Sequence, residues 1–308
     1  MSGLTRVRRF HQDDAHIFCQ PSQIASEISS TLEFIETAYR VFQLPGYRLV
    51  LSTRPDSYIG TISAWDRAET ALEQALDASG KEYSINTGDG AFYGPKIDII
   101  LKDSHGKEHQ TATIQLDFQL PARFNLLYQT SELEKKGTET RDPAGGDFLV
   151  LANPVIIHRA IFGSLERFMA LLIEHYNGRW PFWLSPRQAV VIPVINADHI
   201  LSYARAIQRI LSGVDDPSLK GEIGVAAQKL GRRKFTVDID TSGNSIKKKI
   251  RQAKEMKYHF VAVVGERNIA SQTVTINSSS QLPMSEDQRE MSAIEAYEMF
   301  VDIENQYL

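Results

Sequence analysis

The sequence is poor in cysteine and has no long hydrophobic run. Cys19 is its single cysteine, which excludes a disulfide framework and any metal site built from cysteines alone. The apolar run 258–264 is among the longest, and it is far shorter than the roughly 18 residues that a membrane-spanning helix needs. The first residues also lack the apolar stretch of a signal peptide. We therefore expect neither a small disulfide-rich protein nor a membrane partner.

Length and composition indicate two globular domains. The chain has 308 residues, and domains usually span roughly 100–200 residues. Its 42% of apolar residues suffices for packed cores, so wholesale disorder is excluded. The aromatic and proline-rich stretch 180–186 separates two different patterns. We therefore predict domains at 1–185 and 186–308.

The first domain reads as a mixture of strands and helices. From Arg6 to Cys19 the side chains alternate as in a strand, which would place Arg6, Phe10, Asp14 and His16 on one face. Apolar periodicity predicts helices at 22–41, 65–79 and 159–176, and strands at 47–53, 96–102, 111–116 and 155–158. The polar, glycine-containing stretch 130–147 is predicted to be a surface loop.

In the second domain strands and helices alternate. The predicted strands are 189–194, 235–240, 260–265 and 274–277, and the predicted helices are 198–211, 245–257 and 292–306. This order indicates a small α/β domain with a mainly parallel sheet.

Charge is unevenly distributed within the second domain. Residues 229–257 contain ten basic and three acidic residues, although the whole chain carries a formal net charge of -4. Such a patch suits a polyanionic partner, but a solvated helix face would have the same composition.

The first predicted strand carries the strongest chemical signal. A strand face with two arginines, an aromatic ring, a carboxylate and a histidine is costly to bury unless it lines a polar site. Arginines would suit phosphate, Phe10 a base and Asp14 a ligand amine. The alternative is an exposed edge strand whose charges prevent aggregation.

Two histidines are candidate metal ligands. His16 and His158 both fall on predicted strands, although a pair so far apart in sequence is a weak signal by itself. Cys19 lies three positions after His16 and therefore on the other strand face, where we expect a buried thiol.

Two further segments can approach a ligand. The turn 88–96 is glycine-rich and ends in Lys96, but its spacing excludes a P-loop, so it is either an anion-facing turn or a plain hairpin connection. Arg167 lies near the start of a predicted helix, where it either meets a ligand or pairs with an acid.

Together these segments resemble the threonyl-tRNA synthetase family of class II aminoacyl-tRNA synthetases. Residues 3–19 resemble the second half of the family's motif 2, and residues 158–167 resemble its motif 3. Residues 88–98 resemble the family's GDGAFYGPKID stretch, and residues 113–121 match a further family stretch. Residues 180–188 resemble the junction to the anticodon domain in its eukaryotic cytosolic form. The resemblance implies an incomplete antiparallel-sheet class II catalytic domain (α+β) followed by a small α/β anticodon-binding domain, in a cytoplasmic threonine–tRNA ligase.

The resemblance also implies roles for individual residues. His16 and His158 would bind Zn²⁺, which chelates the amino group and hydroxyl of threonine and so rejects valine. Asp14, Tyr93 and Gln115 would hold threonine. The residues implied for ATP with Mg²⁺ and for catalysis are Arg6, Phe10, Lys96, Gln110 and Arg167. Simple alternation puts Gln110 and Gln115 on opposite faces, so both roles require an irregular strand.

A third partner, tRNA(Thr), is implied for the second domain. The family approaches the anticodon at positions matching Asn244, Lys248, Lys249, Arg251 and Glu266. Basic side chains there would position the RNA backbone, whereas side chains near splayed bases would specify it. Asn268 departs from an acidic residue that is common in the family.

Some family features are not found in this sequence. We expect that motif 1, the editing region, one motif 2 arginine and the cysteine zinc ligand are missing, which leaves two of three zinc ligands and makes the family's homodimer doubtful. Three readings follow: a fragment or incomplete gene model of a working threonine–tRNA ligase, which can be inactive on its own, a non-catalytic tRNA-binding or regulatory paralogue, or another class II synthetase such as a prolyl or histidyl enzyme. Asp14, His16 and His158 together disfavour the last.

Overall fold

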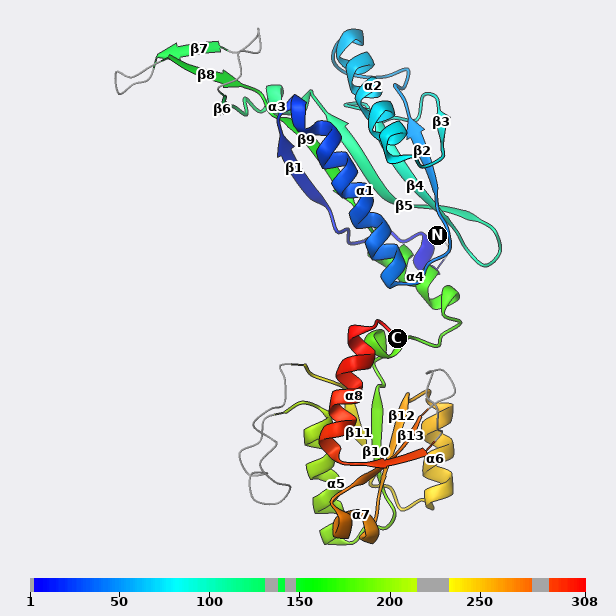
Figure 1. Cartoon of the computed structure of the whole chain (residues 1–308). Coiled ribbons are helices and arrows are strands. Elements are labelled where there is room, and N and C mark those ends of the chain that lie inside the picture. Colours follow the sequence, from blue (N-terminus) through cyan, green and yellow to red (C-terminus); the bar gives the residue numbers. More distant parts are fainter. Residues whose placement is uncertain (1–2, 131–137, 142–147, 215–232, 279–287) are drawn as a thin grey trace. The chain divides into compact units, whose positions relative to one another are not determined.

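The computed structural model describes residues 3–130, 138–141, 148–214, 233–278 and 288–308, and divides the chain into two compact units. Unit 1 is Met1–Gly178 and unit 2 is Arg179–Leu308 (Figure 1). None of the helices formed by the described residues is long and apolar enough to cross a membrane.

Unit 1 is built on a six-stranded sheet in the order β1-β9-β5-β4-β2-β3, in which only β2 and β3 pair in parallel. The strands are β1 (Ala15–Cys19), β2 (Arg48–Ser52), β3 (Tyr83–Asn86), β4 (Lys96–Lys102), β5 (Glu108–Asp117) and β9 (Val155–Ala160). A second, three-stranded sheet contains β6 (Tyr128–Thr130), β8 (Phe148–Ala152) and β7 (Thr138–Arg141).

Helices α1 (Ile24–Val41) and α2 (Ile62–Ser79) lie side by side along the six-stranded sheet (Figure 1). Their apolar stripes, which include Ile28, Leu32, Trp65 and Leu72, are at most 2% exposed. Gly80 ends α2 in the left-handed conformation, as a C-terminal glycine commonly does. Short helices η1 (Gly3–Thr5), η2 (Pro21–Gln23) and α3 (Leu120–Arg123) and the longer α4 (Leu165–His175) complete the unit.

Unit 2 contains a mixed sheet in the order β11-β10-β12-β13-β14. Strands β10 (Ala189–Pro193), β11 (Val237–Ile239) and β12 (Phe260–Val264) are parallel, whereas β13 (Val274–Ser278) and β14 (Gln288–Met291) are antiparallel. Its helices are η3 (Phe182–Leu184), α5 (Asp198–Leu211), α6 (Ile246–Glu255), α7 (Glu266–Ser271) and α8 (Ala293–Asn305). The main core lies between the sheet, α5 and α8, and a smaller one lies under α6.

Two predicted elements of unit 1 are wrong in extent. The strand predicted over 6–19 is confined to Ala15–Cys19, because residues 11–13 bond with the segment 161–166 instead of continuing the ladder. The helix predicted from residue 159 starts at Leu165, because β9 runs on to Ala160 and Gly163 turns the chain at a φ of +64°. Ser164 then caps α4 through its hydroxyl.

Other differences concern short elements. The predicted loop 130–147 contains strand β7, and the rest of it lies outside the described residues apart from Thr130, which ends β6. The sheet of unit 2 is mixed and not mainly parallel, because β14 adds a second antiparallel strand. Strand β3 and helix α7 were not expected from the sequence.

Candidate functional site

One face of the six-stranded sheet carries a row of polar side chains. The strand register pairs His16 with His158, His158 with Gln115, Gln115 with Lys96, and Lys96 with Ser52. Residues that pair directly across neighbouring strands project to the same face of a sheet. Five side chains from β1, β9, β5, β4 and β2 therefore form one continuous polar row.

The opposite face of these strands forms the core. Ile17 is half-buried, and Ile157, Ile114 and Ile97 are fully buried at 0% exposure. The alternation of strand side chains thus assigns one face to the helices and leaves the other for polar groups. The sequence prediction of a shared polar face is confirmed within β1, where Asp14, just before the strand, and His16 are exposed.

The two candidate metal ligands are neighbours. The ring centroids of His16 and His158 lie 4.7 Å apart in an edge-to-face arrangement. Nε2 of His158 is 3.0 Å from Oδ2 of the fully buried Asp117, a contact typical of the carboxylates that orient ligating histidines. The described residues contain no cluster of three or more His, Cys, Asp or Glu side chains suited to a metal. They therefore fit only part of a zinc site, which needs at least three protein ligands.

Cys19 does not belong to this pair. It projects from the other face of β1 and is 6% exposed, as expected from its spacing to His16. Burial, assisted by the negative charge of Glu27, raises the pKa of the Cys19 thiol to about 11. A buried thiol with a raised pKa stays protonated at neutral pH and is therefore unreactive.

Tyr93 joins the row from the glycine-rich turn. Its hydroxyl donates a hydrogen bond to Oε1 of Gln115, and its ring lies 5.4 Å from that of His158. Burial and the carboxylates of Asp117 and Asp14 raise the pKa of Tyr93, so its hydroxyl stays a donor. The turn packs tightly on β5, since a Cβ added to Gly94 would lie 1.8 Å from the Leu116 carbonyl oxygen.

Asp98 organises the central part of this face. It is 3% exposed, and its Oδ2 accepts from Nζ of Lys96 at 2.7 Å and from the Ser52 hydroxyl at 2.9 Å. Its Oδ1 accepts from Nε2 of Gln110 at 2.5 Å and from the Thr113 hydroxyl at 3.2 Å. A buried carboxylate with one cation and three neutral donors is fully satisfied, so it fixes the position of each partner.

An irregularity in the sheet brings the two glutamines together. The pairing of β4 with β5 shifts between Asp98 and Ile100, so that β5 carries one extra residue. Such a bulge cancels the alternation that would otherwise separate Gln110 from Gln115. The irregular strand required by the sequence comparison is therefore present, and both amides lie on the polar face.

Arg167 connects this face with the segment before β1. From the first turn of α4, its Nε donates to the Thr5 carbonyl at 3.1 Å and its Nη1 to the Gln110 carbonyl at 3.0 Å. Arg6 and Phe10 come after Thr5 in the chain, and both side chains are exposed, that of Phe10 to 51%. The predicted ATP residues thus come from three separate segments that meet at one end of the sheet.

In unit 2 the predicted anticodon residues do not form one uniform surface. Lys248 and Arg251 are exposed on α6, whereas Lys249 is 2% exposed and its Nζ donates to the Asp240 carbonyl at 3.0 Å. Asn244 bonds with Ser242 at 3.2 Å. Lys249 is therefore a structural residue in this arrangement. Lys248 and Arg251 are accessible, although Nε of Arg251 lies 3.5 Å from Oε1 of Glu255 on the same helix.

Two further polar residues of unit 2 lie near strand ends. Glu266 is exposed and its Oε1 is 2.6 Å from Nε2 of His199. Asn268 is buried, because its Oδ1 accepts from the Gly265 amide at 3.0 Å at the start of α7. Its side chain is thus occupied within the domain.

Sequence reasoning missed Asp98, Asp117 and Ser52. The signal for Asp98 was available, because Lys96 and Asp98 occupy alternate positions of an otherwise apolar strand. Asp117 and Ser52 end their strands and carry no comparable pattern.

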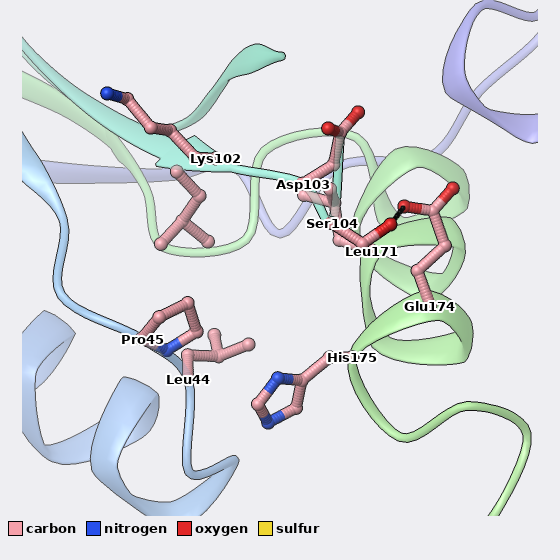
Figure 2. A pocket seen from close by; sticks show the side chains of 9 residues that line it. Leu44, Pro45, Lys102, Asp103, Ser104, Leu171, Glu174 and His175 are labelled. Atoms are coloured by element: carbon pink, nitrogen blue, oxygen red, sulfur yellow. Dashed lines mark hydrogen bonds between the residues drawn. The ribbon is translucent and has the colours of Figure 1, made fainter. Parts of the chain in front are cut away.

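A cavity elsewhere in unit 1 contains none of the polar row. It lies between the loop after α1, the turn after β4 and the end of α4, and its lining includes Leu44, Asp103, Glu174 and His175 (Figure 2). The Ser104 hydroxyl donates to Glu174 at 3.3 Å across one side. The sequence assigns no role to this cavity.

Comparison with known proteins gives the same division of the chain. Residues 1–176 match the family described as the tRNA synthetase class II core domain (G, H, P, S and T), and residues 188–303 match the anticodon binding domain. Histidyl- and prolyl-tRNA synthetase structures match at 16% and 14% identity, which supports the fold alone.

Relatives named for threonine match more closely. A Schizosaccharomyces pombe protein named "Probable threonine--tRNA ligase, mitochondrial" is 44% identical over 98% of this chain and 60% of its own length. Human "Threonine--tRNA ligase 1, cytoplasmic" is 46% identical over 90% of this chain and 34% of its own. The RNA binding domain of Cryptosporidium parvum threonyl-tRNA synthetase superposes with a TM-score of 0.80 at 40% identity, covering 98% of this chain and 66% of that one. The chain thus spans about a third to three fifths of the curated relatives' length.

The assignment of Cys19 to the core predicts an unreactive thiol. In the native chain at pH 8, Cys19 should react with a disulfide reagent such as DTNB at least about tenfold more slowly than in the urea-unfolded chain, because the buried thiol is neutral and shielded. Absorbance of the released thiolate measures the rate. Equal rates in the two states would show that Cys19 is exposed in the native chain and would contradict its assignment to the core.

Proposed function

The chain belongs to the class II aminoacyl-tRNA synthetases, and from this membership we propose that it carries the threonine-activating and anticodon-binding parts of a threonine–tRNA ligase. The reaction would be ATP-dependent activation of threonine and its transfer to tRNA(Thr). The observation that supports this proposal is the polar row from His16 to Ser52, in which Gln115, proposed to bind threonine, lies beside Lys96, proposed to face the phosphate or carboxylate.

Threonine would bind at the β1–β9–β5 end of the row. Asp14 supplies a carboxylate for the amino group, two residues before His16 on the same face. Tyr93 and Gln115, already bonded to each other, supply donor and acceptor groups for the hydroxyl. A site built to hydrogen-bond a hydroxyl rejects an isosteric ligand that lacks it, because its own polar groups are then left unpaired.

ATP with Mg²⁺, which class II synthetases use, would bind towards Arg167. Arg6 would contact the triphosphate and Phe10 the adenine, with Gln110 beside them. Lys96, held by Asp98 at 2.7 Å, would face the α-phosphate or the threonine carboxylate. These residues orient the ligands and offset negative charge, and they make no covalent bond.

The chemistry runs in two displacement steps. A carboxylate oxygen of threonine attacks the α-phosphorus of ATP, which releases pyrophosphate and leaves threonyl-adenylate. A terminal ribose hydroxyl of the tRNA then attacks the threonyl carbonyl carbon, and AMP leaves. The positive charges of Lys96, Arg6 and Arg167 favour the first step, where charge builds up on the phosphate oxygens.

Zinc is proposed only as a partial assignment. His16 and His158 are proposed as two ligands, and the described residues supply no cluster of three His, Cys, Asp or Glu side chains around them. None of the steps above depends on the metal.

The second unit is proposed to bind the anticodon region of tRNA(Thr). Lys248 and Arg251 are the exposed basic residues among the predicted positions, and Asn244 and Glu266 lie near the strand ends. For the compartment we propose the cytoplasm, supported by relatives named cytoplasmic, although the S. pombe relative is named mitochondrial.

Amino-acid activation is the direct test of the proposed reaction. The chain should catalyse ATP–pyrophosphate exchange that depends on threonine and not on valine, and Asp14→Asn should lower it at least about tenfold, because the charge-assisted contact to the amine is lost. Glu33→Gln, an exposed substitution on α1, is the matched control. Exchange is followed with labelled pyrophosphate. Because motif 1 and one motif 2 arginine are expected to be missing, the exchange should be slower than that of a full-length relative, and an equal rate would contradict that expectation. A chain that retains tRNA binding but binds neither threonine nor ATP would favour the non-catalytic paralogue.

The accessible charge on α6 predicts a salt-dependent tRNA complex. Replacing both Lys248 and Arg251 by Ala should weaken tRNA binding and reduce the slope of log K against log salt by about 0.7 to 0.9 for each lost phosphate contact. Arg205→Ala on the exposed face of α5 is the control. Filter binding at several salt concentrations measures both quantities. An unchanged affinity and slope would identify the α6 charges as a solvated face.

A further inference from the structure

The segment before β1 is held at both ends by the start of α4. At one end Arg167 donates to the Thr5 carbonyl at 3.1 Å. At the other end the Leu165 amide donates to the His11 carbonyl at 2.8 Å, and Gln12 forms a β-bridge with Ser164. Residues 6–10 therefore form a short loop whose two ends rest on one helix terminus.

Glu166 is the main side-chain anchor of the second end. Its Oε2 and Oε1 lie 3.0 and 3.1 Å from the His11 amide nitrogen, which donates to the carboxylate, and Oε1 is also 2.7 Å from Nδ1 of His11. The Ser164 hydroxyl donates to Oε2 at 3.1 Å. These bonds to His11 and Ser164 lower the pKa of Glu166 to about 2, so the carboxylate is ionised under all ordinary conditions.

A second carboxylate, that of Asp13, holds the segment before β1 against the end of β9. Asp13 accepts from the amides of Ile161 and Phe162 at 2.7 and 3.0 Å. The two acids bind backbone amides on opposite sides of the junction, since Glu166 holds the loop and Asp13 holds the end of β9. Bonds between a carboxylate and backbone amides are charge-assisted and stronger than neutral ones.

The loop between the anchors carries exposed cations. Arg6, Arg8, Arg9 and Phe10 are exposed, and the described part of the chain offers their side chains no hydrogen bond or ion pair. Long side chains of this kind bind a polyphosphate more tightly when the backbone that carries them is already fixed, because less ordering is lost on binding. The anchors of this loop at Thr5 and His11 come from the start of α4, and Arg6 also takes part in a β-bridge.

We propose that Glu166 is a positioning residue for nucleotide: it holds the loop 6–10 in the geometry in which Arg6 and Phe10 meet ATP, without touching the nucleotide itself. This inference rests on the proposed function of the same site. Glu166 acts on the loop through its bonds to His11. Arg167 holds the other end of the loop at Thr5 and faces the nucleotide site.

The test compares Glu166→Gln and Glu166→Ala with wild type and with the control Glu33→Gln. Hydrogen exchange of peptides spanning residues 5–13 reports the anchor, and isothermal titration of the full chain with ATP and Mg²⁺ reports nucleotide affinity. Exchange at His11 should become about tenfold faster or more in Glu166→Ala, from loss of a charge-assisted bond. The dissociation constant for ATP should rise about five- to tenfold, with a smaller change in Glu166→Gln, which keeps one acceptor. The control should match wild type in both readouts.

Two results would contradict the role of Glu166 and leave the proposed function standing. One is unchanged exchange at His11 in both variants, and the other is faster exchange with unchanged ATP affinity, which would make the anchor purely structural. A wild-type chain that binds no ATP would instead contradict the proposed function, and the role of Glu166 would fall with it. Melting temperatures of the variants within about 2 °C of wild type exclude general unfolding as the cause.

Discussion

The register of the six-stranded sheet is the constraint on which the site depends. Antiparallel pairing places His16, His158, Gln115, Lys96 and Ser52 opposite one another across five strands, and the alternate residues of the same strands fill the core. A shift of one residue in any pairing would turn that strand's polar groups into the core and its apolar groups out. Burial of the apolar face thus fixes the arrangement of the polar face.

The site has an inner part, which is a hydrogen-bonded network on the sheet, and an outer part, which is an exposed loop. In the inner part Asp98 joins Lys96, Gln110, Ser52 and Thr113 through hydrogen bonds and an ion pair. A buried carboxylate is tolerable only with such compensation, and removal of one charged partner is expected to be strongly destabilising. The outer part is the loop 6–10, where the cations are exposed and the backbone alone is fixed. The first part sets geometry and the second supplies charge for a ligand.

Local patterns in the sequence predicted much of the fold but not the long-range contacts. Strand 96–102 and helix 198–211 have the predicted bounds, because each has a clear apolar period and a clear end. The first strand was predicted too long, since the bonds that divert residues 11–13 come from Asp13 and Glu166 acting between segments about 150 residues apart. Lys249 was placed among accessible anticodon residues, but a lysine within a basic run gives no local sign that its ammonium is buried on Asp240. The bulge in β5 could be required by the family resemblance but not located by alternation.

The double-mutant cycle of Asp98 and Gln110 tests the central claim most directly, because it asks whether the irregular strand brings Gln110 to the polar face. The free energies of unfolding of Asp98→Ala, Gln110→Ala and the double variant are measured by urea titration, with the distant pair Asp98→Ala and Glu33→Ala as the additive control. The register described here predicts a coupling of about 1 kcal/mol or more between Asp98 and Gln110. A coupling near zero, as in the control pair, would mean that Gln110 projects to the other face and would contradict the account.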